Sequence, residues 1–96
     1  MKLPKDFPKQ INKANILFAT RPKCPSMIYD DKNKKTLDIE YYTIVQYEKS
    51  VEINLLSLDD CFNIIGDSSF PNVDRTIAEL EPDNISFKDW KRITHN

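Results

Sequence analysis

The sequence predicts an α+β domain: a small antiparallel sheet of three or four strands in the N-terminal half, packed against two or three short helices in the C-terminal half. Apolar and polar residues alternate over residues 37–47, the period of a half-buried strand. Over residues 58–65 apolar residues recur at helical spacing instead. Strands followed by helices are typical of this class. We expect one domain over residues 1–96, with frayed extreme termini.

Short apolar segments predict the strands of the N-terminal half. Residues 16–18 (ILF) indicate a buried strand that Arg21-Pro22 closes, and residues 27–29 (MIY) indicate a second. The strand over 37–47 is rich in aromatic and β-branched residues, and another strand is predicted over 51–56. Short polar connections favour an antiparallel meander, because parallel pairs need long crossovers.

A short helix is predicted between the last strand and the only glycine of the chain. Ser57 and Asp60 occupy N-cap and N3 positions, an acidic variant of the capping box. Gly66 stands where a left-handed C-cap belongs. The apolar side of this helix carries four residues, namely Leu58, Cys61, Phe62 and Ile65. The Cys61 thiol is therefore expected to be buried.

Two further helices are predicted in the C-terminal third. The first lies between Pro71 and Pro82. The second begins at Ser86, where Asp89 completes another capping box, and extends to Ile93. One more short helical turn is predicted after Asp6 near the start of the chain.

Motifs for catalysis or metal binding are lacking in this sequence. It has no GxSxG, HExxH, CxxC or phosphate-binding loop. The only histidine, His95, is one residue from the end of the sequence, and it is distant along the chain from Cys24 and Cys61. Paired carboxylates such as Asp59-Asp60 are typical of the first turn of a helix. We therefore expect no catalytic residue, no metal and no cofactor.

The composition indicates a cytoplasmic protein. The start of the sequence has no apolar run of a signal peptide, and no segment is apolar enough to span a membrane. We therefore expect both cysteines to be reduced. Eleven Ile, eleven Lys and eight Asn against three Ala and one Gly indicate an AT-rich coding region. Such a region fits a low-GC bacterium, a phage or a mobile island, and also some eukaryotic genomes.

An acidic surface is the first candidate binding site. Residues 59–83 hold seven Asp/Glu and one Arg, a net charge of −6. If the first two helices pack side by side, these residues form one negative face, which would steer a basic protein partner. Plain solvation of the two helices is the alternative. The candidate partner-binding residues are Asp59, Asp60, Asn63, Asp67, Asp74 and Glu79, together with Tyr42 as an exposed aromatic anchor. The alternative for Tyr42 is that a helix covers it.

A basic segment is the second candidate. Residues 1–35 hold nine Lys/Arg and three Asp/Glu, a net charge of +6, interleaved with aromatic residues. Such a segment can follow a nucleic-acid backbone. Of the nine basic residues in this segment only Arg21 is an arginine, and arginine is the preferred residue for phosphate recognition. Nucleic acid is therefore the less favoured partner. The simplest use of the segment is to pack near the acidic helices.

In size and charge the chain resembles the small inhibitors and immunity proteins that neutralise toxins or defence enzymes. No motif carries this resemblance. Our leading hypothesis is a non-catalytic binding protein that occludes a basic functional surface of a partner, such as a toxin or a nuclease. The alternatives are a small nucleic-acid-binding or regulatory protein that uses the basic N-terminal third, and a minor enzyme.

Overall fold

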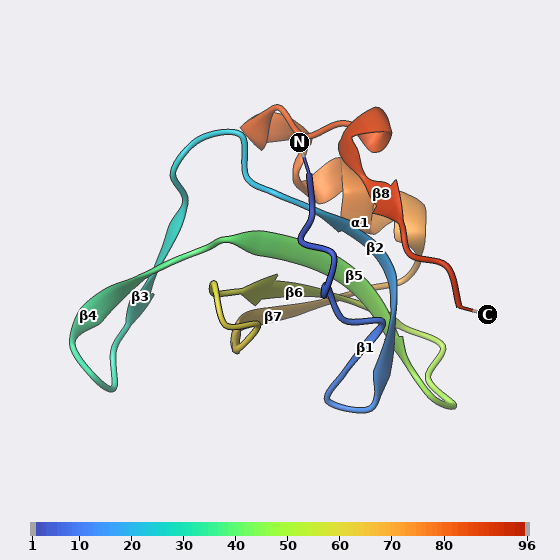
Figure 1. Ribbon diagram of the computed structural model, residues 1–96, viewed down its shortest axis with the longest axis horizontal. Helices are drawn as coiled ribbons and strands as arrows, with labels where there is room; N and C mark the ends of the chain where they lie inside the picture. Colours follow the sequence, from blue (N-terminus) through green and yellow to red (C-terminus); the bar gives the residue numbers. More distant parts are fainter. Residues whose placement is uncertain (1, 96) are drawn as a thin grey trace.

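The computed structural model describes residues 2–95, and strands dominate them. Eight strands are joined by one α-helix and two single turns of 3₁₀ helix (Figure 1). The strands are β1 (Gln10–Ile11), β2 (Ala14–Thr20), β3 (Met27–Asp30), β4 (Lys35–Asp38), β5 (Tyr41–Tyr47), β6 (Ile53–Leu58), β7 (Ile64–Phe70) and β8 (Lys91–Arg92). The helical segments are α1 (Val73–Glu79), η1 (Glu81–Asp83) and η2 (Phe87–Asp89).

Six of the strands form one curled antiparallel sheet, in the order β1-β2-β5-β6-β7, with β8 added to β2. β3 and β4 form a separate two-stranded hairpin that projects from the body of the molecule (Figure 1). The long centre of the sheet is a meander in which β5 pairs with β6, and β6 pairs with β7. β7 is the last strand of this order and forms one edge of the main sheet.

The helical segments cover one face of the sheet. Ile77 and Leu80, from α1 and the residue that ends it, pack with Ile85 and Trp90 against side chains of β5 and β6. Ile44 from β5 is fully buried in this cluster. The Thr20 hydroxyl donates to the Asp89 carbonyl at 3.0 Å, which ties the sheet to η2. Apolar burial on this face therefore depends on the C-terminal third of the chain.

The N-terminal segment covers the opposite face. Ile16, Val45, Leu56 and other buried residues of the strands form a second cluster, on which Leu3 and Phe7 pack. Within this cluster Phe7, Tyr41 and Phe62 form a group of aromatic rings. Edge-to-face aromatic pairs stabilise such packing beyond the area that they bury. The sheet is thus buried on both faces, and this explains why β5 is almost continuously apolar.

The predicted α+β class is wrong, because the chain is mostly strand. Strands account for 41% of the residues and helical segments for 14%. Three or four strands against two or three helices were expected, whereas eight strands accompany one α-helix and two 3₁₀ turns. The shortest strands, β1 and β8, have two residues each, which is too short for any periodicity to indicate them.

The helix predicted over 58–65 does not exist. Ser57 and Leu58 end β6, and Ile64 begins β7. Gly66 is no C-cap but pairs with Ser57 across the hairpin. A Cβ added to Gly66 would lie 2.7 Å from Ile28 Cδ1, so this glycine allows the projecting hairpin to pack closely on the sheet. Cys61, expected to be buried, is exposed in the turn.

The other helix predictions have mixed outcomes. The helix between Pro71 and Pro82 is confirmed as α1, with Asn72 as its N-cap. The helix from Ser86 begins as predicted, with both hydrogen bonds of the capping box. It ends after one 3₁₀ turn, because β8 then pairs with β2. The helical turn expected after Asp6 is absent from the segment, which the structure describes as a turn and coil.

The strand predictions place most strands but not their ends. Residues 16–18 and 27–29 lie within β2 and β3 as predicted. The strand over 37–47 is in fact two strands, because the chain leaves the projecting hairpin at Ile39 and Glu40 to enter the main sheet. The strand predicted over 51–56 is β6, which begins two residues later. The predicted fraying of the extreme termini concerns residues outside the described range.

Candidate protein-binding surface

The projecting β3–β4 hairpin presents large apolar side chains to solvent. Met27 and Tyr29 lie on its outward face and are 59% and 56% exposed, whereas Ile28 between them is partly buried against the sheet. Their cross-strand partners are Asp38 and Thr36, so these four side chains share one face of the hairpin. Exposed aromatic residues and methionines are enriched among the residues that anchor protein interfaces.

The tip of the hairpin is fixed by its own polar residues. Asp30 accepts hydrogen bonds from the backbone N–H groups of Lys32 and Asn33, at 3.1 and 3.3 Å, and from the Asn33 side chain at 2.8 Å. The side-chain hydrogen bond from Asn33 is the main cause that lowers the pKa of Asp30. Lys34 adopts φ 55°, the left-handed conformation that closes the turn. The tip of the β3–β4 hairpin is therefore closed by a turn whose hydrogen bonds come from its own residues.

The junction between β4 and β5 brings the base of the hairpin to the main sheet. The Ile39 N–H donates to the Ser26 carbonyl, and the Glu40 N–H donates to the Leu58 carbonyl, both at 2.8 Å. The second bond joins the junction to the last residue of β6. It therefore holds Asp38 and Glu40 beside the β6–β7 turn.

The β6–β7 turn is built around Asp59. Its Oδ1 accepts from the N–H groups of Cys61 and Asn63 at 2.9 and 2.8 Å, and its Oδ2 accepts from Asn63 Nδ2 at 2.9 Å. Burial acts to raise the pKa of Asp59, but the hydrogen bonds from Asn63 and Cys61 outweigh it, so that the pKa lies below the ordinary value of an aspartate. Phe62 adopts φ 64° and packs on Phe7, which anchors the turn to the second core.

Four carboxylates meet where this turn approaches the hairpin. Asp38, Glu40, Asp59 and Asp60 line one hollow of about 250 Å³, together with side chains of β4. The negative charge of this group affects the adjacent Cys61, because the Asp60 carboxylate raises the pKa of the Cys61 thiol. Across residues 2–95 the one ion pair is elsewhere, so none of these carboxylates has a basic group within 4 Å. This end of the sheet is thus acidic and without bound counter-charge.

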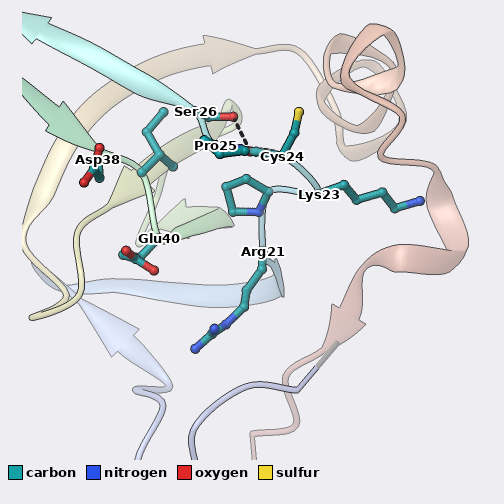
Figure 2. A pocket seen from close by; sticks show the side chains of 9 residues that line it. Arg21, Lys23, Cys24, Pro25, Ser26, Asp38 and Glu40 are labelled. Atoms are coloured by element: carbon teal, nitrogen blue, oxygen red, sulfur yellow. Dashed lines mark hydrogen bonds between the residues drawn. The ribbon is translucent and has the colours of Figure 1, made fainter.

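A second hollow, of about 380 Å³, lies next to the first and shares Asp38 and Glu40 with it. Figure 2 shows it between these acids and the loop 21–26. Both of its cationic side chains are engaged elsewhere. Arg21 donates from Nη2 to the Tyr41 hydroxyl at 2.9 Å and lies over that ring, and Lys23 pairs with Asp89 at 2.9 Å.

The pKa of Asp89 falls to about 2, chiefly through the hydrogen bond from the Ser86 backbone and then through Lys23. This carboxylate belongs to the capping box of η2, so its ion pair fixes the loop 21–26 to the C-terminal segment. Lys23 therefore neutralises Asp89 and leaves the acids of the hollow without a partner.

The structure separates the candidate residues that the sequence grouped on two helices. Asp59, Asp60 and Asn63 lie in the β6–β7 turn, whereas Asp74 and Glu79 lie on α1 at the other end of the hairpin. The seven residues of β7 extend over about 23 Å between them. One continuous acidic face on two adjacent helices is therefore a wrong prediction.

Two other candidates also differ from expectation. Tyr42 is 6% exposed and belongs to the core beneath the helical segments, where burial raises its pKa. It is no exposed anchor. Asp67 lies on β7 and accepts a hydrogen bond from Asn54 Nδ2 at 2.9 Å. The basic first third does not pack against acidic helices through ion pairs, since the one pair among residues 2–95 joins Lys23 to Asp89.

Sequence reasoning missed the exposed side chains Met27 and Tyr29 and the acids Asp38 and Glu40 as members of this surface. The alternation of Met27, Ile28 and Tyr29 was visible, but it did not show which face would be covered. Asp38 and Glu40 counted as the polar side of one long strand. Their position depends on the break between β4 and β5, for which the sequence has no proline or glycine as a marker.

No group of three or more His, Cys, Asp or Glu side chains within residues 2–95 is placed to hold a metal ion. Cys24 and Cys61 are both free and exposed. His95 Nε2 lies 2.6 Å from the Ile16 carbonyl, within hydrogen-bond distance of the backbone of β2. Of the helices described, none has the length and apolar character needed to cross a membrane.

Comparison of the chain with protein-family models, with curated proteins and with solved structures finds no match.

Proposed function

We propose that the protein is a non-catalytic binding protein that occludes a basic functional surface of another protein, in the manner of an inhibitor or immunity protein acting on a toxin or a nuclease. One observation carries the proposal. Exposed Met27 and Tyr29 share a face of the projecting hairpin with Asp38, and Asp38 borders a hollow with three more carboxylates that have no basic partner.

Each part of this surface has its own role in binding. Burial of Met27 and Tyr29 against a partner provides affinity, because large apolar anchors dominate the energy of interfaces. The four carboxylates attract a basic partner over a distance and select against acidic ones. Targets that bind phosphates carry basic surfaces, so a negative surface suits their inhibition. The mechanism is occlusion: the bound hairpin and the carboxylates beside it cover the basic surface of the target and exclude its substrate.

Nucleic-acid binding by the basic N-terminal third has less support. Four of its lysines lie in residues 2–13, on or beside the segment that covers the second core, and three lie at the tip of the hairpin. The exposed free thiols at Cys24 and Cys61 fit our proposal of a cytoplasmic protein, since reducing compartments maintain such thiols.

Surface plasmon resonance with two defined probes tests the proposal. The probes are the purified product of the neighbouring gene and a DNA duplex. We expect the protein probe to bind, and Tyr29→Ala combined with Asp38→Lys to weaken binding by about tenfold or more. The control, Asp74→Lys on α1, makes the same change in net charge at a distance from the hairpin and should leave affinity within about twofold.

Two results would contradict the proposal. One is binding of the DNA duplex that is lost when Lys32 and Lys35 are changed to Glu, which would assign the function to the basic segment. The other is a protein complex that the α1 control weakens and the hairpin variant does not.

A further inference from the structure

The outer edge of β7 is an open sheet edge. β7 pairs with β6 on one side, and within residues 2–95 no strand pairs with its other side. In an antiparallel strand about every second residue directs its backbone N–H and C=O away from a given neighbour. None of these outward groups of β7 has a backbone partner elsewhere in the described chain. The edge is a row of free donors and acceptors.

The two edges of the main sheet differ in how they are protected. The edge beside β2 is covered by β1 and β8, which have two residues each, and β8 consists of Lys91 and Arg92. Short strands and basic side chains are common devices against strand addition. β7 has seven residues and contains no Lys, Arg or Pro. Its one irregularity lies near its start, so that Gly66 to Phe70 form a regular stretch.

The charge around this edge indicates what it can accept. Residues 59–74 hold four aspartates, Asp59, Asp60, Asp67 and Asp74, and no basic residue. A two-fold pairing of β7 with β7 of a second copy would bring the acidic turn of each copy toward Asp74 of the other. Like charges would then face each other at both ends of the ladder. An added strand that carries basic side chains would instead be attracted by these aspartates.

We propose that the outer edge of β7 accepts an extended, lysine- or arginine-bearing segment of the partner protein as an added β-strand. This inference rests on the proposed function, since it describes how the same basic partner is bound. Main-chain hydrogen bonds supply affinity in such complexes, and side-chain contacts supply specificity. Asp67 lies in the middle of this edge, where its carboxylate can attract a basic side chain of the added strand. A hollow of about 450 Å³ beside Phe70, lined also by Val51, offers apolar contact at the end of the strand.

The test uses the ¹⁵N-labelled full chain and a short synthetic peptide in which lysine alternates with valine. A second peptide of the same sequence carries N-methyl groups on alternate amides, which removes the donors of one edge. A third replaces lysine by glutamate. Binding is followed by amide chemical shifts and by hydrogen exchange of β7.

We expect the lysine peptide to shift and protect the outward amides between Ile64 and Phe70. The N-methylated and glutamate peptides should bind at least about tenfold more weakly, because the ladder and the charge attraction are lost. Ser68→Lys, at an exposed position of the edge, should weaken binding of the lysine peptide to the same extent. Gln10→Lys, on β1 at the opposite edge, is the matched control and should leave binding unchanged.

Three outcomes would overturn the inference. If shifts are confined to the hairpin and the acidic turn and N-methylation has no effect, the edge is not used, whereas the proposed function stands. If β7 becomes protected with rising protein concentration alone, the occupant is a second copy. If the lysine peptide binds nowhere, the edge does not accept basic strands, and the resonance experiment with the protein probe still decides the proposed function separately.

Discussion

Two segments of this chain have the same local pattern and different structures. Residues 57–65 and 72–80 each begin with a residue that can cap a helix, followed by apolar residues at helical spacing. The second segment is α1, where Asn72 Oδ1 accepts from the Arg75 N–H at 2.9 Å. In the first, the oxygen of Asp59 accepts from the N–H groups of Cys61 and Asn63 and closes a turn between two strands.

The difference shows that capping chemistry does not choose between a helix and a turn. A side-chain oxygen that satisfies nearby N–H groups suits both. The choice follows from what the adjacent apolar residues can bury. Ile77 and Leu80 from the second segment are covered by the sheet, whereas Leu58 from the first already belongs to β6. β6 gains a full ladder of hydrogen bonds when the following residues return as β7.

The largest effect that separates the two segments is expected from loss of packing under the helix. Ile77→Ala should destabilise the protein by about 2–5 kcal/mol, because Ile77 is buried between α1 and the sheet. The free energy of unfolding in urea measures this, with Glu79→Gln on the exposed side of the same helix as control. A change below about 0.5 kcal/mol for Ile77→Ala would mean that α1 does not pack on the sheet.

A smaller effect is expected from the residue that organises the turn. Asp59→Ala removes an acceptor from two backbone N–H groups and one side chain, and we expect a loss of about 1–2 kcal/mol in the free energy of unfolding. Asp60→Ala, one position further along, makes the same chemical change at an exposed side chain that accepts from none of the backbone N–H groups bound by Asp59, and should have little effect. Equal effects of the two changes would contradict the role of Asp59.

The smallest effects come from the two N-terminal positions of the predicted helices. Asn72→Ala removes a cap in use and should destabilise by about 1 kcal/mol. Ser57→Ala should destabilise the protein less than Asn72→Ala, because Ser57 is a buried residue within β6 that loses only its hydroxyl and caps nothing. Thermal and chemical unfolding of both variants would compare them. A loss at Ser57 as large as that at Asn72 would support the helix over 58–65 instead of the hairpin.

The sequence was sufficient where the local pattern and the tertiary packing agree. β2, β3, β5 and β6 were located, and so were α1 and the Ser86–Asp89 capping box. It was insufficient where long-range pairing overrides local preference. Residues 64–70 have no strict alternation, and only their partner β6 identifies them as a strand. β8 shortens the last helix to a single turn for the same reason, because Lys91 and Arg92 pair with β2.

The candidate site was predictable in its charge and not in its geometry. Asp59, Asp60 and Asn63 were selected from the sequence, but on a helix and together with residues of α1. Their actual neighbours, Asp38 and Glu40, reach them because the Glu40 N–H bonds to the Leu58 carbonyl. No local pattern in a single sequence indicates such a contact between residues 18 positions apart. Tyr42 was misjudged because alternation cannot show that both faces of β5 are covered.

The acidic end of the sheet and the open edge of β7 both exist only if residues 53–70 form a hairpin. The most direct test is the pattern of nuclear Overhauser contacts in this segment. We expect cross-strand contacts between Leu56 and Asp67 and between Leu55 and Ser68, with extended backbone couplings on both sides of the turn. Sequential contacts from residue i to i+3 along residues 58–65, with no cross-strand contacts, would show a helix and contradict the account.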